Sequence, residues 1–508
     1  MDTTTWSVAR IAAAVAAGET TVAGVVDAHL DRVEAWNPLL NAVVTVPGEL
    51  ALEAARAADR RLRSGQPPRP LEGVPFVVKD TIATAGVRTT YGSRLYRDFV
   101  PAESAVAVTR LQEAGAILLA KANVSEFGHD PYCNTYSEQF GMTRNPWDPG
   151  RTAGGSSGGV AAAVAVGMAP LGLATDWGGS IRGPAAFCGI YGLRPTPGRV
   201  PVYPHETLSG FAWDQPVEDV QGPIARHPGD LRAALRVIAG PDPRAPQSLA
   251  SYSPEASTSS RVRVAYAGDF DGRLPVEPSV ASACRGLVDT LAAIGVDVAD
   301  AAPASVPRLV SETLDGVRPV GLVMRYGERF QQDPDSLGQF LREQVARAMS
   351  SDLAALAAGE RARTRLWHAM REFMADYDVL ATPTWGFAPF SLSSAAARTQ
   401  NGIALGAPEF WQYTLSTQLF SVLGYPAISV PAGLTPEGLP VGVQLAAVPG
   451  REGLLIDLAE ALESVCGPAP APPARPVGEV PPVVDPAFAL PYQPTVSPPE
   501  TERSARRW

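Results

Sequence analysis

The sequence predicts an α/β fold with a largely parallel β-sheet, and three observations lead to this fold class. Compact apolar runs at Val74–Val78 and Ala116–Leu119 have the length and composition of buried strands. The segment Ser104–Ala114 between them has the residue spacing of a helix, which completes a β-α-β unit. Strands that alternate with helices in this way belong to parallel sheets.

Further segments fit the same fold class. At the N-terminus, residues 6–18, 20–36 and 48–65 space their apolar and charged side chains as helices do, and Thr20–Thr21 is a suitable cap for the second of them. Helical periodicity returns over residues 338–376. We therefore expect a helical opening and a second helical region late in the chain.

Strand and helix signals also lie between two serine-containing motifs. Val160–Val166 is an alanine-rich apolar run that predicts a buried helix, and Ala169–Ala174 predicts a strand after it. Val422–Val430 and Val441–Ala447 have strand character near the C-terminus. A loop, helix and strand in succession would bring Ser156 and Ser180 close together.

The composition indicates a globular protein whose partner is a small molecule. Its 508 residues would suggest about three domains by length alone, and 45% hydrophobic residues are enough for a sizeable core. A net charge of −10, without any basic run, argues against nucleic-acid binding. The cysteines lack C-x-x-C spacing, so we expect free thiols in a reducing compartment and no metal cluster at Cys133, Cys188, Cys284 and Cys466.

The sequence lacks the pattern of a signal peptide or of a membrane-spanning segment. Ile11–Ala17 is short, weakly hydrophobic and preceded by Asp2 rather than a basic cluster, which favours an amphipathic helix over a signal peptide. No apolar stretch approaches the roughly 20 residues that cross a bilayer. We expect a cytoplasmic protein without a membrane partner.

Residues 467–508 form a proline-dense tail. Prolines at this density exclude an ordinary helix or a central strand. Two interpretations stay open for the tail: an extended strap or disordered end, and a polyproline segment that binds a partner.

Two glycine-flanked serines suggest nucleophilic chemistry. Ser156 lies in Gly154–Gly159, which reads GGSSGG, and Ser180 follows 24 positions later in Asp176–Arg182, which reads DWGGSIR. A serine that attacks a carbonyl needs backbone N–H groups near the developing oxyanion, and glycines leave those groups accessible. We expect the N–H groups of Trp177, Gly178, Gly179 and Ser180 to form the oxyanion hole.

Lys79 is the candidate base for this serine chemistry. It follows the apolar run Phe76–Val78, so a strand that leaves the core would deliver it to the site. Burial favours the neutral form of a lysine, and a neutral amine can accept a proton. A lysine base would allow a serine nucleophile without histidine.

These motifs together resemble the amidase signature hydrolases, a family with a Ser-cisSer-Lys triad. By this resemblance Ser180 is the nucleophile, Ser156 the bridging serine and Lys79 the base. The similarity also covers Lys121–Asn123 and Arg144–Trp147, and it continues weakly to Asp376–Leu380 and Gly424–Pro431. It therefore includes nearly the whole chain before about residue 466.

The resemblance implies an architecture and a local geometry. The expected fold is the amidase signature fold, a large twisted, mixed and mostly parallel sheet covered by helices on both faces. A single domain would span residues 1–466, with a helical part at about 1–66, a catalytic core at about 70–200 and a pocket-shaping region at about 300–415. The Gly155–Ser156 peptide bond would be cis.

Other catalytic patterns are poorly matched. Gly155–Gly159 also satisfies G-x-S-x-G with Ser157 as nucleophile, but a turn-rich loop rather than a strand precedes it. The five histidines have no triad motif, and His129 is the one weak pocket candidate among His29, His129, His205, His227 and His368. No P-loop or H-E-x-x-H motif is present, so we expect no nucleotide, metal or other cofactor.

Several residues beside the motifs receive supporting assignments. The resemblance suggests that Asp176 and Arg182 fix the nucleophile loop, although a catalytic acid and a substrate clamp are the alternative, and Ser157 is structural. Cys188 is interpreted as a buried small hydrophobe. Aromatic and thiol side chains in segments that resemble pocket walls are the substrate-binding candidates: Tyr132, Cys133, Trp177, Trp385, Phe387 and Trp411.

Two functions from different classes follow. The first is an independent amidase that hydrolyses a small neutral aryl or alkyl amide, with carbamates or esters as an extension. The second is the glutamine-hydrolysing subunit of a tRNA-dependent amidotransferase, which needs a partner protein. The aromatic candidates favour the first, and the sequence does not decide between a monomer and a homodimer.

Overall fold

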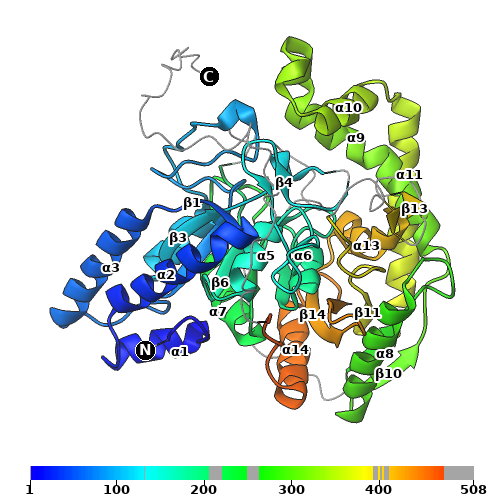
Figure 1. The fold of residues 1–508 in the computed structure, drawn as a ribbon. Coiled ribbons are helices and arrows are strands. Elements are labelled where there is room, and N and C mark those ends of the chain that lie inside the picture. The colour runs from blue at the N-terminus through cyan, green and yellow to red at the C-terminus, as the bar shows by residue number, and fades with distance from the viewer. Residues whose placement is uncertain are drawn as a thin grey trace.

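One sheet of eleven strands runs through the part of the chain that the structure describes (Figure 1). The computed structural model describes residues 2–130, 132–204, 220–248, 262–392, 399–400, 403–404 and 411–473. In order across the sheet, the strands are β1 (Val43–Thr45), β3 (Ile117–Ala122), β2 (Pro75–Lys79), β6 (Leu171–Asp176), β8 (Val220–Ala225), β7 (Tyr191–Arg194), β14 (Ala427–Leu434), β15 (Pro440–Ala446), β11 (Val379–Pro383), β9 (Arg263–Tyr266) and β10 (Asp297–Asp300). Two small antiparallel pairs stand apart, β4 (Tyr136–Ser137) with β5 (Gly141–Met142) and β12 (Thr399–Gln400) with β13 (Ile403–Ala404).

The sheet is mixed, as expected, and its parallel pairs lie in two groups. β2 runs parallel to β3 and β6, and β9 runs parallel to β10 and β11. The other six pairings in this sheet are antiparallel, so parallel pairs are fewer than the sequence indicates. A short connection explains one of these pairings, because residues 435–439 between β14 and β15 leave no room for a crossover.

The β-α-β unit predicted from residues 74–119 is confirmed. The helix α4 (Val106–Glu113) connects β2 to β3, and these two strands are parallel. All five residues of β2 and all six of β3 are buried, which explains their continuous apolar composition.

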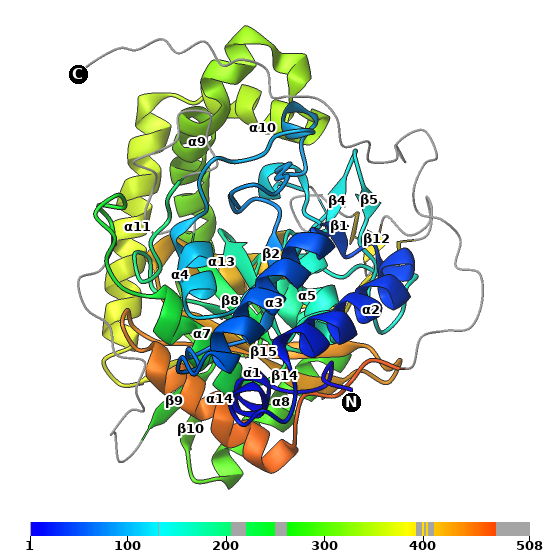
Figure 2. The same ribbon diagram turned by 90° about the vertical axis from the view of Figure 1, so that its left-hand side faces the viewer.

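The three predicted N-terminal helices are present as α1 (Val8–Ala16), α2 (Val22–Leu40) and α3 (Gly48–Arg63). Thr21 caps α2, and its Oγ1 accepts a hydrogen bond from the Gly24 N–H at 3.0 Å. The helices α2 and α3 pack on the β2 and β3 end of the sheet (Figure 2).

The later helices differ in part from the prediction. The region 338–376 contains two helices rather than one, and Asp352 caps the second. The sequence analysis does not predict the long helix α9 (Val306–Gln332) before them. The remaining helices are α5 (Gly158–Ala165), α6 (Arg182–Cys188), α7 (Pro228–Ile238), α8 (Pro278–Ala293), α9 (Val306–Gln332), α10 (Gln339–Met349), α11 (Leu353–Phe373), α13 (Leu415–Leu423) and α14 (Glu452–Cys466). Short 3₁₀ turns are η1 (Arg94–Tyr96), η2 (Glu126–Gly128), η3 (Pro334–Ser336) and η5 (Gln412–Thr414).

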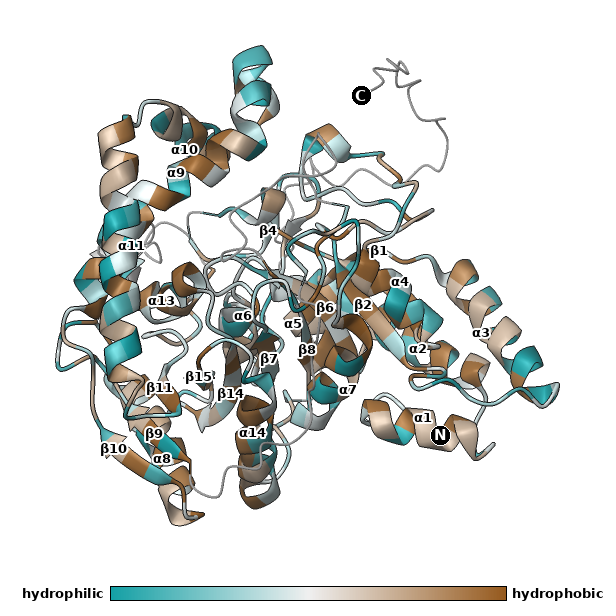
Figure 3. Cartoon of the chain, turned by 180° about the vertical axis from the view of Figure 1, so that it is seen from behind, coloured by the Kyte–Doolittle hydropathy of each residue, from teal (hydrophilic) through white to brown (hydrophobic). Residues whose placement is uncertain are grey.

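Helices cover both faces of the sheet, as the strand β14 shows. Ala427 belongs to one apolar cluster with Phe420 of α13 and Met370 of α11. The next residue, Ile428, belongs to the other main cluster, which includes Val288 of α8. Successive strand residues point to opposite faces, so both faces are buried. Figure 3 shows the resulting hydrophobic colouring along the central strands.

The predicted strand Val422–Val430 begins later in the structure than the sequence indicates. The sequence predicts that a strand begins at Val422, but this residue lies in the last turn of α13, which Gly424 ends in a left-handed conformation at φ 70°. The strand itself begins at Ala427.

The proline-dense tail lies outside the described residues from position 474 onward. Within the described residues, no helix has both the length and the apolar composition needed to span a membrane.

The topology brings the predicted catalytic segments to one edge of the sheet. β2 and β6 are parallel neighbours in which Val78 pairs with Leu173, so Lys79 and the end of β6 lie at the same edge. Carboxyl ends of parallel strands are where α/β folds usually place their sites.

Candidate active site

Lys79 lies at the buried end of β2 and contacts Ser156, the predicted bridging serine. Its side chain is fully buried. Its Nζ donates hydrogen bonds to Ser156 Oγ at 2.8 Å and to Thr175 Oγ1 at 2.7 Å. Both partners are hydroxyl groups, which can also donate to a neutral amine.

Ser156 lies in the loop before α5, where the Gly155–Ser156 peptide bond is cis, as the resemblance implies. The residue is 4% exposed, and its side chain reaches the cavity described below. Gly155 has no room for a side chain, because a Cβ there would collide with the backbone of Asn134. The glycines of this loop therefore allow close packing of two backbone segments around Ser156.

Ser180 lies in the loop Trp177–Ile181, which connects β6 to α6. It is half-buried and lines the same cavity as Ser156. Gly179 has a φ of 123°, and a Cβ there would come within 2.6 Å of Thr417 Oγ1. This position therefore requires glycine.

The oxyanion-hole prediction needs one correction. The Gly179 N–H donates to Asp176 Oδ1 at 2.8 Å, so it is engaged inside the loop rather than directed at a substrate. The sequence indicates an accessible amide there, but not that the nearby carboxylate takes it. Trp177, Gly178 and Ser180 stay the expected donors, and all three line the cavity.

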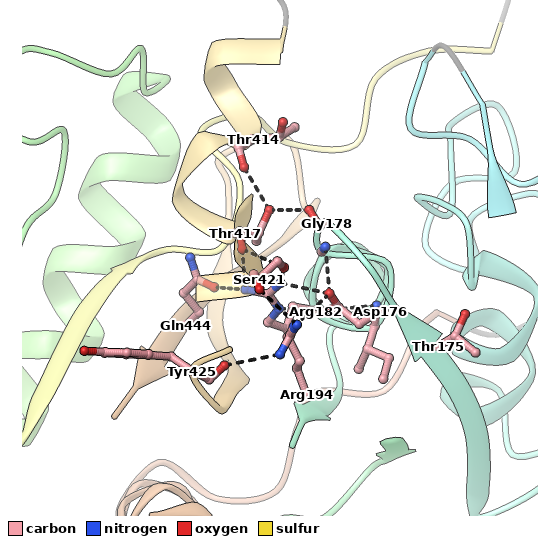
Figure 4. A network of polar contacts seen from close by, with 12 residues as sticks. Thr175, Asp176, Gly178, Arg182, Arg194, Thr414, Thr417, Ser421, Tyr425 and Gln444 are labelled. Carbon is pink, nitrogen blue, oxygen red and sulfur yellow. Dashed lines mark hydrogen bonds and ion pairs between the residues drawn. The ribbon is translucent and has the colours of Figure 1, made fainter. Parts of the chain in front are cut away.

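A buried ion pair holds the nucleophile loop (Figure 4). Arg182 Nη2 contacts Asp176 Oδ1 at 2.9 Å, and Arg182 Nε contacts Asp176 Oδ2 at 2.9 Å. Arg194 Nε lies 3.5 Å from Asp176 Oδ1. Burial alone would raise the pKa of Asp176, but the two guanidinium groups and the Gly179 N–H outweigh it and hold this pKa well below its usual range.

The same network connects the loop to α13 and the sheet. Arg182 also donates to the Thr417 carbonyl, to Ser421 Oγ and to Gln444 Oε1, each at 2.9 Å. Thr417 Oγ1 donates to the Gly178 carbonyl at 2.8 Å. Side chains from α6, α13 and β15 thus hold the loop in place, and they fix the orientation of its backbone N–H groups.

Both serines open onto one cavity of about 90 Å³. Lys79 does not line it, because Ser156 and Thr175 lie between the amine and the cavity. A bound molecule would therefore meet the hydroxyl groups of Ser180, Ser156 and Thr175 directly, and the lysine only through Ser156 or Thr175.

The segment from Phe127 to Asn134 forms another wall, and it includes His129. Burial, together with the positive charges of Arg318, Arg325 and Lys79, lowers the pKa of His129 to about 3. The imidazole is neutral near pH 7. Burial raises the pKa of Asp130 to about 6, although its carboxyl accepts hydrogen bonds from the Asn134 and Tyr132 N–H groups.

The predicted aromatic residues divide into two groups. Trp177, Trp385, Trp411 and Cys133 line the cavity. Tyr132 and Phe387 are absent from its wall, and they belong to the aromatic cluster packed behind it. Phe387 stacks on Trp385 at a centroid distance of 5.7 Å, so it supports the wall without reaching the cavity.

The sequence analysis misses several cavity residues, among them Thr175, Arg318 and Arg325. Thr175 directly precedes the motif at Asp176, and only the strand register shows that it faces Lys79. Arg318 and Arg325 come from α9 and line the cavity together. Their seven-residue spacing is a signal for one helix face, but the sequence does not tell what that face meets.

The other candidates have structural surroundings. Ser157 is buried and donates to the Thr175 carbonyl at 3.3 Å, and it does not line the cavity. Cys188 is buried, which raises the pKa of its thiol. The four cysteines are free thiols, as predicted. His205 lies outside the described residues, and within those residues no cluster of three His, Cys, Asp or Glu side chains could hold a metal.

Comparison with known proteins identifies the family. The family model described as Amidase matches residues 24–456. The chain belongs to the amidase family. This confirms the resemblance to amidase signature hydrolases and the α/β architecture it implies. The enzyme is a carbon–nitrogen hydrolase that acts on amides.

Relatives of this amidase have two kinds of described activity. A glutamyl-tRNA(Gln) amidotransferase subunit of Chloroflexus aurantiacus is 35% identical over 485 residues, covering 89% of this chain and 94% of its own. An acylamidase of Rhodococcus erythropolis is 33% identical over 470 residues, which cover 90% of this chain and 95% of the acylamidase. Among solved structures, a bacterial aryl acylamidase of the amidase signature family superimposes with a TM-score of 0.81 at 26% identity. The superposition covers 90% of this chain and 96% of the aryl acylamidase.

Proposed function

We propose that this amidase hydrolyses the C–N bond of a small neutral aryl or alkyl amide through Ser180, Ser156 and Lys79. The observation that supports this most is the 2.8 Å hydrogen bond between Lys79 Nζ and Ser156 Oγ, next to a cavity that both serines line. The chemistry requires a nucleophile exposed to substrate and a base protected from water.

In the first half of the reaction, Ser180 Oγ attacks the amide carbonyl carbon. Its proton passes to Ser156 Oγ while the Ser156 proton passes to neutral Lys79. The carbonyl oxygen becomes an oxyanion, which the N–H groups of Trp177, Gly178 and Ser180 stabilise. The relay then returns a proton to the leaving nitrogen, the C–N bond breaks, and an acyl-enzyme ester on Ser180 is left.

In the second half, water takes the place of the amine. The relay accepts a proton from this water as its oxygen attacks the ester carbonyl of the acylated Ser180. Collapse of the second tetrahedral intermediate breaks the ester bond and returns the proton to Ser180 Oγ. The carboxylic acid leaves, and the three side chains regain their initial protonation states.

The aromatic part of the cavity supports an aryl or alkyl substrate. Trp177, Trp385 and Trp411 give it apolar surfaces beside the two hydroxyl groups. The resemblance to amidase signature hydrolases implies a small or β-branched residue before Gly178, where this chain has Trp177, and we propose that its larger ring narrows the acyl side of the site. The similarity to an acylamidase favours the same class. Carbamates and esters are extensions, because they present the same carbonyl to Ser180.

The alternative is a glutamine-hydrolysing subunit of a tRNA-dependent amidotransferase. The similarity to the amidotransferase subunit of Chloroflexus aurantiacus is the observation that favours it. The two functions differ in whether the purified chain works alone. An independent amidase needs no partner, whereas the amidotransferase component would act on glutamine with its partner present.

A substrate panel tests the proposal. The purified chain is assayed against aryl and alkyl amides, anilides, carbamates, esters and glutamine, with Ser180→Ala as the matched control. We expect turnover of amides or anilides by the wild-type chain and none by Ser180→Ala. Glutaminase activity that appears only with an added partner would favour the alternative.

A further inference from the structure

A second cavity adjoins the catalytic one, and the two share part of their walls. Arg318, Trp411 and Gln418 line both. The second cavity lies among α9, α10 and α13, and α9 packs against each of the other two helices. In Figure 1 and Figure 2, α10 lies at the outer end of this group and α13 lies nearer the centre of the molecule. We call it the α9–α10 groove.

The volumes indicate why the catalytic cavity is not sufficient by itself. Cavities that hold a drug-sized molecule measure about 300–1,000 Å³. The catalytic cavity measures about 90 Å³, which accommodates the scissile amide and a small substituent. The α9–α10 groove measures about 520 Å³ and begins where the catalytic cavity ends. A larger substrate therefore extends into the groove.

Arg318 lies at the junction between the two spaces. Its guanidinium is positioned over the ring of Trp177 at 4.9 Å from the centroid, which connects α9 to the nucleophile loop. The side chain is half-buried. A molecule that passes from Ser180 toward the groove would pass between side chains that line both cavities, and Arg318 is one of them.

The groove, like the catalytic cavity, has both apolar and hydrogen-bonding side chains in its wall. Leu314, Leu322 and Leu415 form apolar parts of it. Side chains that donate or accept hydrogen bonds make up most of the rest: Ser311, Asp315, Gln344, Arg347, Ser351 and Gln412. Charges of both signs and several neutral groups suit a polar chain without a net charge.

We propose that the α9–α10 groove is a second substrate subsite, which binds the distal, polar and uncharged chain of an extended amide. This inference rests on the proposed function, because it places the scissile bond of the same molecule beside Ser180. Arg318 is the specificity-determining residue at the junction. Amides that end close to the scissile bond use the catalytic cavity alone.

The test compares amides of matched length. One series carries an ethylene glycol chain and the other an alkyl chain, attached on the acyl side or on the amine side, and each is compared with a short parent amide. For the wild-type enzyme we expect kcat/KM of the glycol series to exceed that of the short amide by about tenfold or more, and the alkyl series to gain less.

Two tryptophan substitutions on α9 separate the groove from general effects. Ser311→Trp fills the groove, and the ratio of kcat/KM for the glycol-extended amide over the short amide should fall about tenfold. Met324 is exposed on α9 and lines neither cavity, so Met324→Trp should keep the wild-type ratio. A ratio that Ser311→Trp leaves unchanged would overturn the proposal.

Binding to the inactive Ser180→Ala enzyme separates this proposal from the proposed function. Calorimetry should give a Kd for the glycol-extended amide about tenfold lower than that for the short amide, and Ser311→Trp in the same background should abolish the difference. Equal Kd values would overturn the groove subsite even in an active enzyme. Groove-dependent binding without any turnover by the wild-type chain would refute the proposed function alone.

Discussion

Lys79 Nζ lies 2.8 Å from Ser156 Oγ, and Ser156 separates this amine from the catalytic cavity. The arrangement has a direct mechanistic consequence. A fully buried lysine that does not line the cavity can take part in proton transfer only through an intervening hydroxyl group. This position of Lys79 supports the proposed relay order Ser180, Ser156, Lys79.

A relay predicts strongly non-additive losses. Ser156→Ala and Lys79→Ala should each lower kcat/KM by roughly three orders of magnitude or more, and the double variant should be little worse than either one. Steady-state kinetics on the three variants, each shown to be folded by circular dichroism, measures the coupling. Losses that simply multiply would indicate two independent roles.

Lys79→Arg distinguishes a base from a positive charge. Arginine keeps the charge but does not deprotonate near neutral pH, so we expect the variant to be nearly inactive although folded. In the wild-type enzyme, kcat/KM should rise with pH as the free enzyme loses the proton of its base. A Lys79→Arg enzyme with most of its activity would show that the lysine is only an electrostatic anchor.

Thr175 is expected to position Lys79. Its Oγ1 accepts a hydrogen bond from Lys79 Nζ at 2.7 Å, and Thr175→Val removes this acceptor with little change in shape. We expect kcat/KM to fall about tenfold to a hundredfold and the pH dependence of kcat/KM to shift. A fall in activity with an unchanged pH profile would point to a structural effect alone.

His129 should not determine the pH profile. Its pKa is lowered to about 3 by burial and by Arg318, Arg325 and Lys79, so the ring is neutral over the range in which amidases are assayed. His129→Gln should keep the shape of the kcat/KM profile between about pH 5 and 8, where an ordinary histidine titrates. Loss of an inflection in this range would identify His129 as a functional acid or base.

The extent of successful prediction depends on how local each signal is. Ser156 and Ser180 lie in short glycine-rich segments, and Lys79 ends an apolar strand. The residues adjacent to each of them in the sequence are therefore enough to predict the local backbone structure there. The β-α-β unit is equally local, and its strands and helix agree with the sequence within a few residues.

Long-range packing could not be predicted in the same way. The helical spacing of Arg318 and Arg325 indicates a shared face, but only tertiary structure brings this face to the catalytic cavity. Trp385 and Phe387 look equivalent in sequence, yet one lines the cavity and the other supports it from behind. The Gly179 amide is engaged by Asp176 because of how the loop folds on itself.

The last prediction concerns the Asp176–Arg182 pair and its dependence on pH. Because Arg182, Arg194 and the Gly179 N–H hold the pKa of Asp176 below its usual range, ionisation of this carboxyl stabilises the fold. The contribution is complete above the unfolded-state pKa of about 3.9 and is lost as pH falls through the lower folded-state value. Asp176→Asn should therefore lower the free energy of unfolding most near pH 7. The difference from wild type should shrink below about pH 4, by at most about 1.4 kcal/mol for each pH unit.

Urea unfolding between pH 3 and pH 7 measures this difference in the free energy of unfolding between wild type and Asp176→Asn. The control is Arg308→Ala, which removes an exposed ion pair to Glu312 and should change the free energy of unfolding by less than about 1 kcal/mol. A difference between wild type and Asp176→Asn that stays constant down to pH 3 would show that the carboxylate charge is not what stabilises the nucleophile loop.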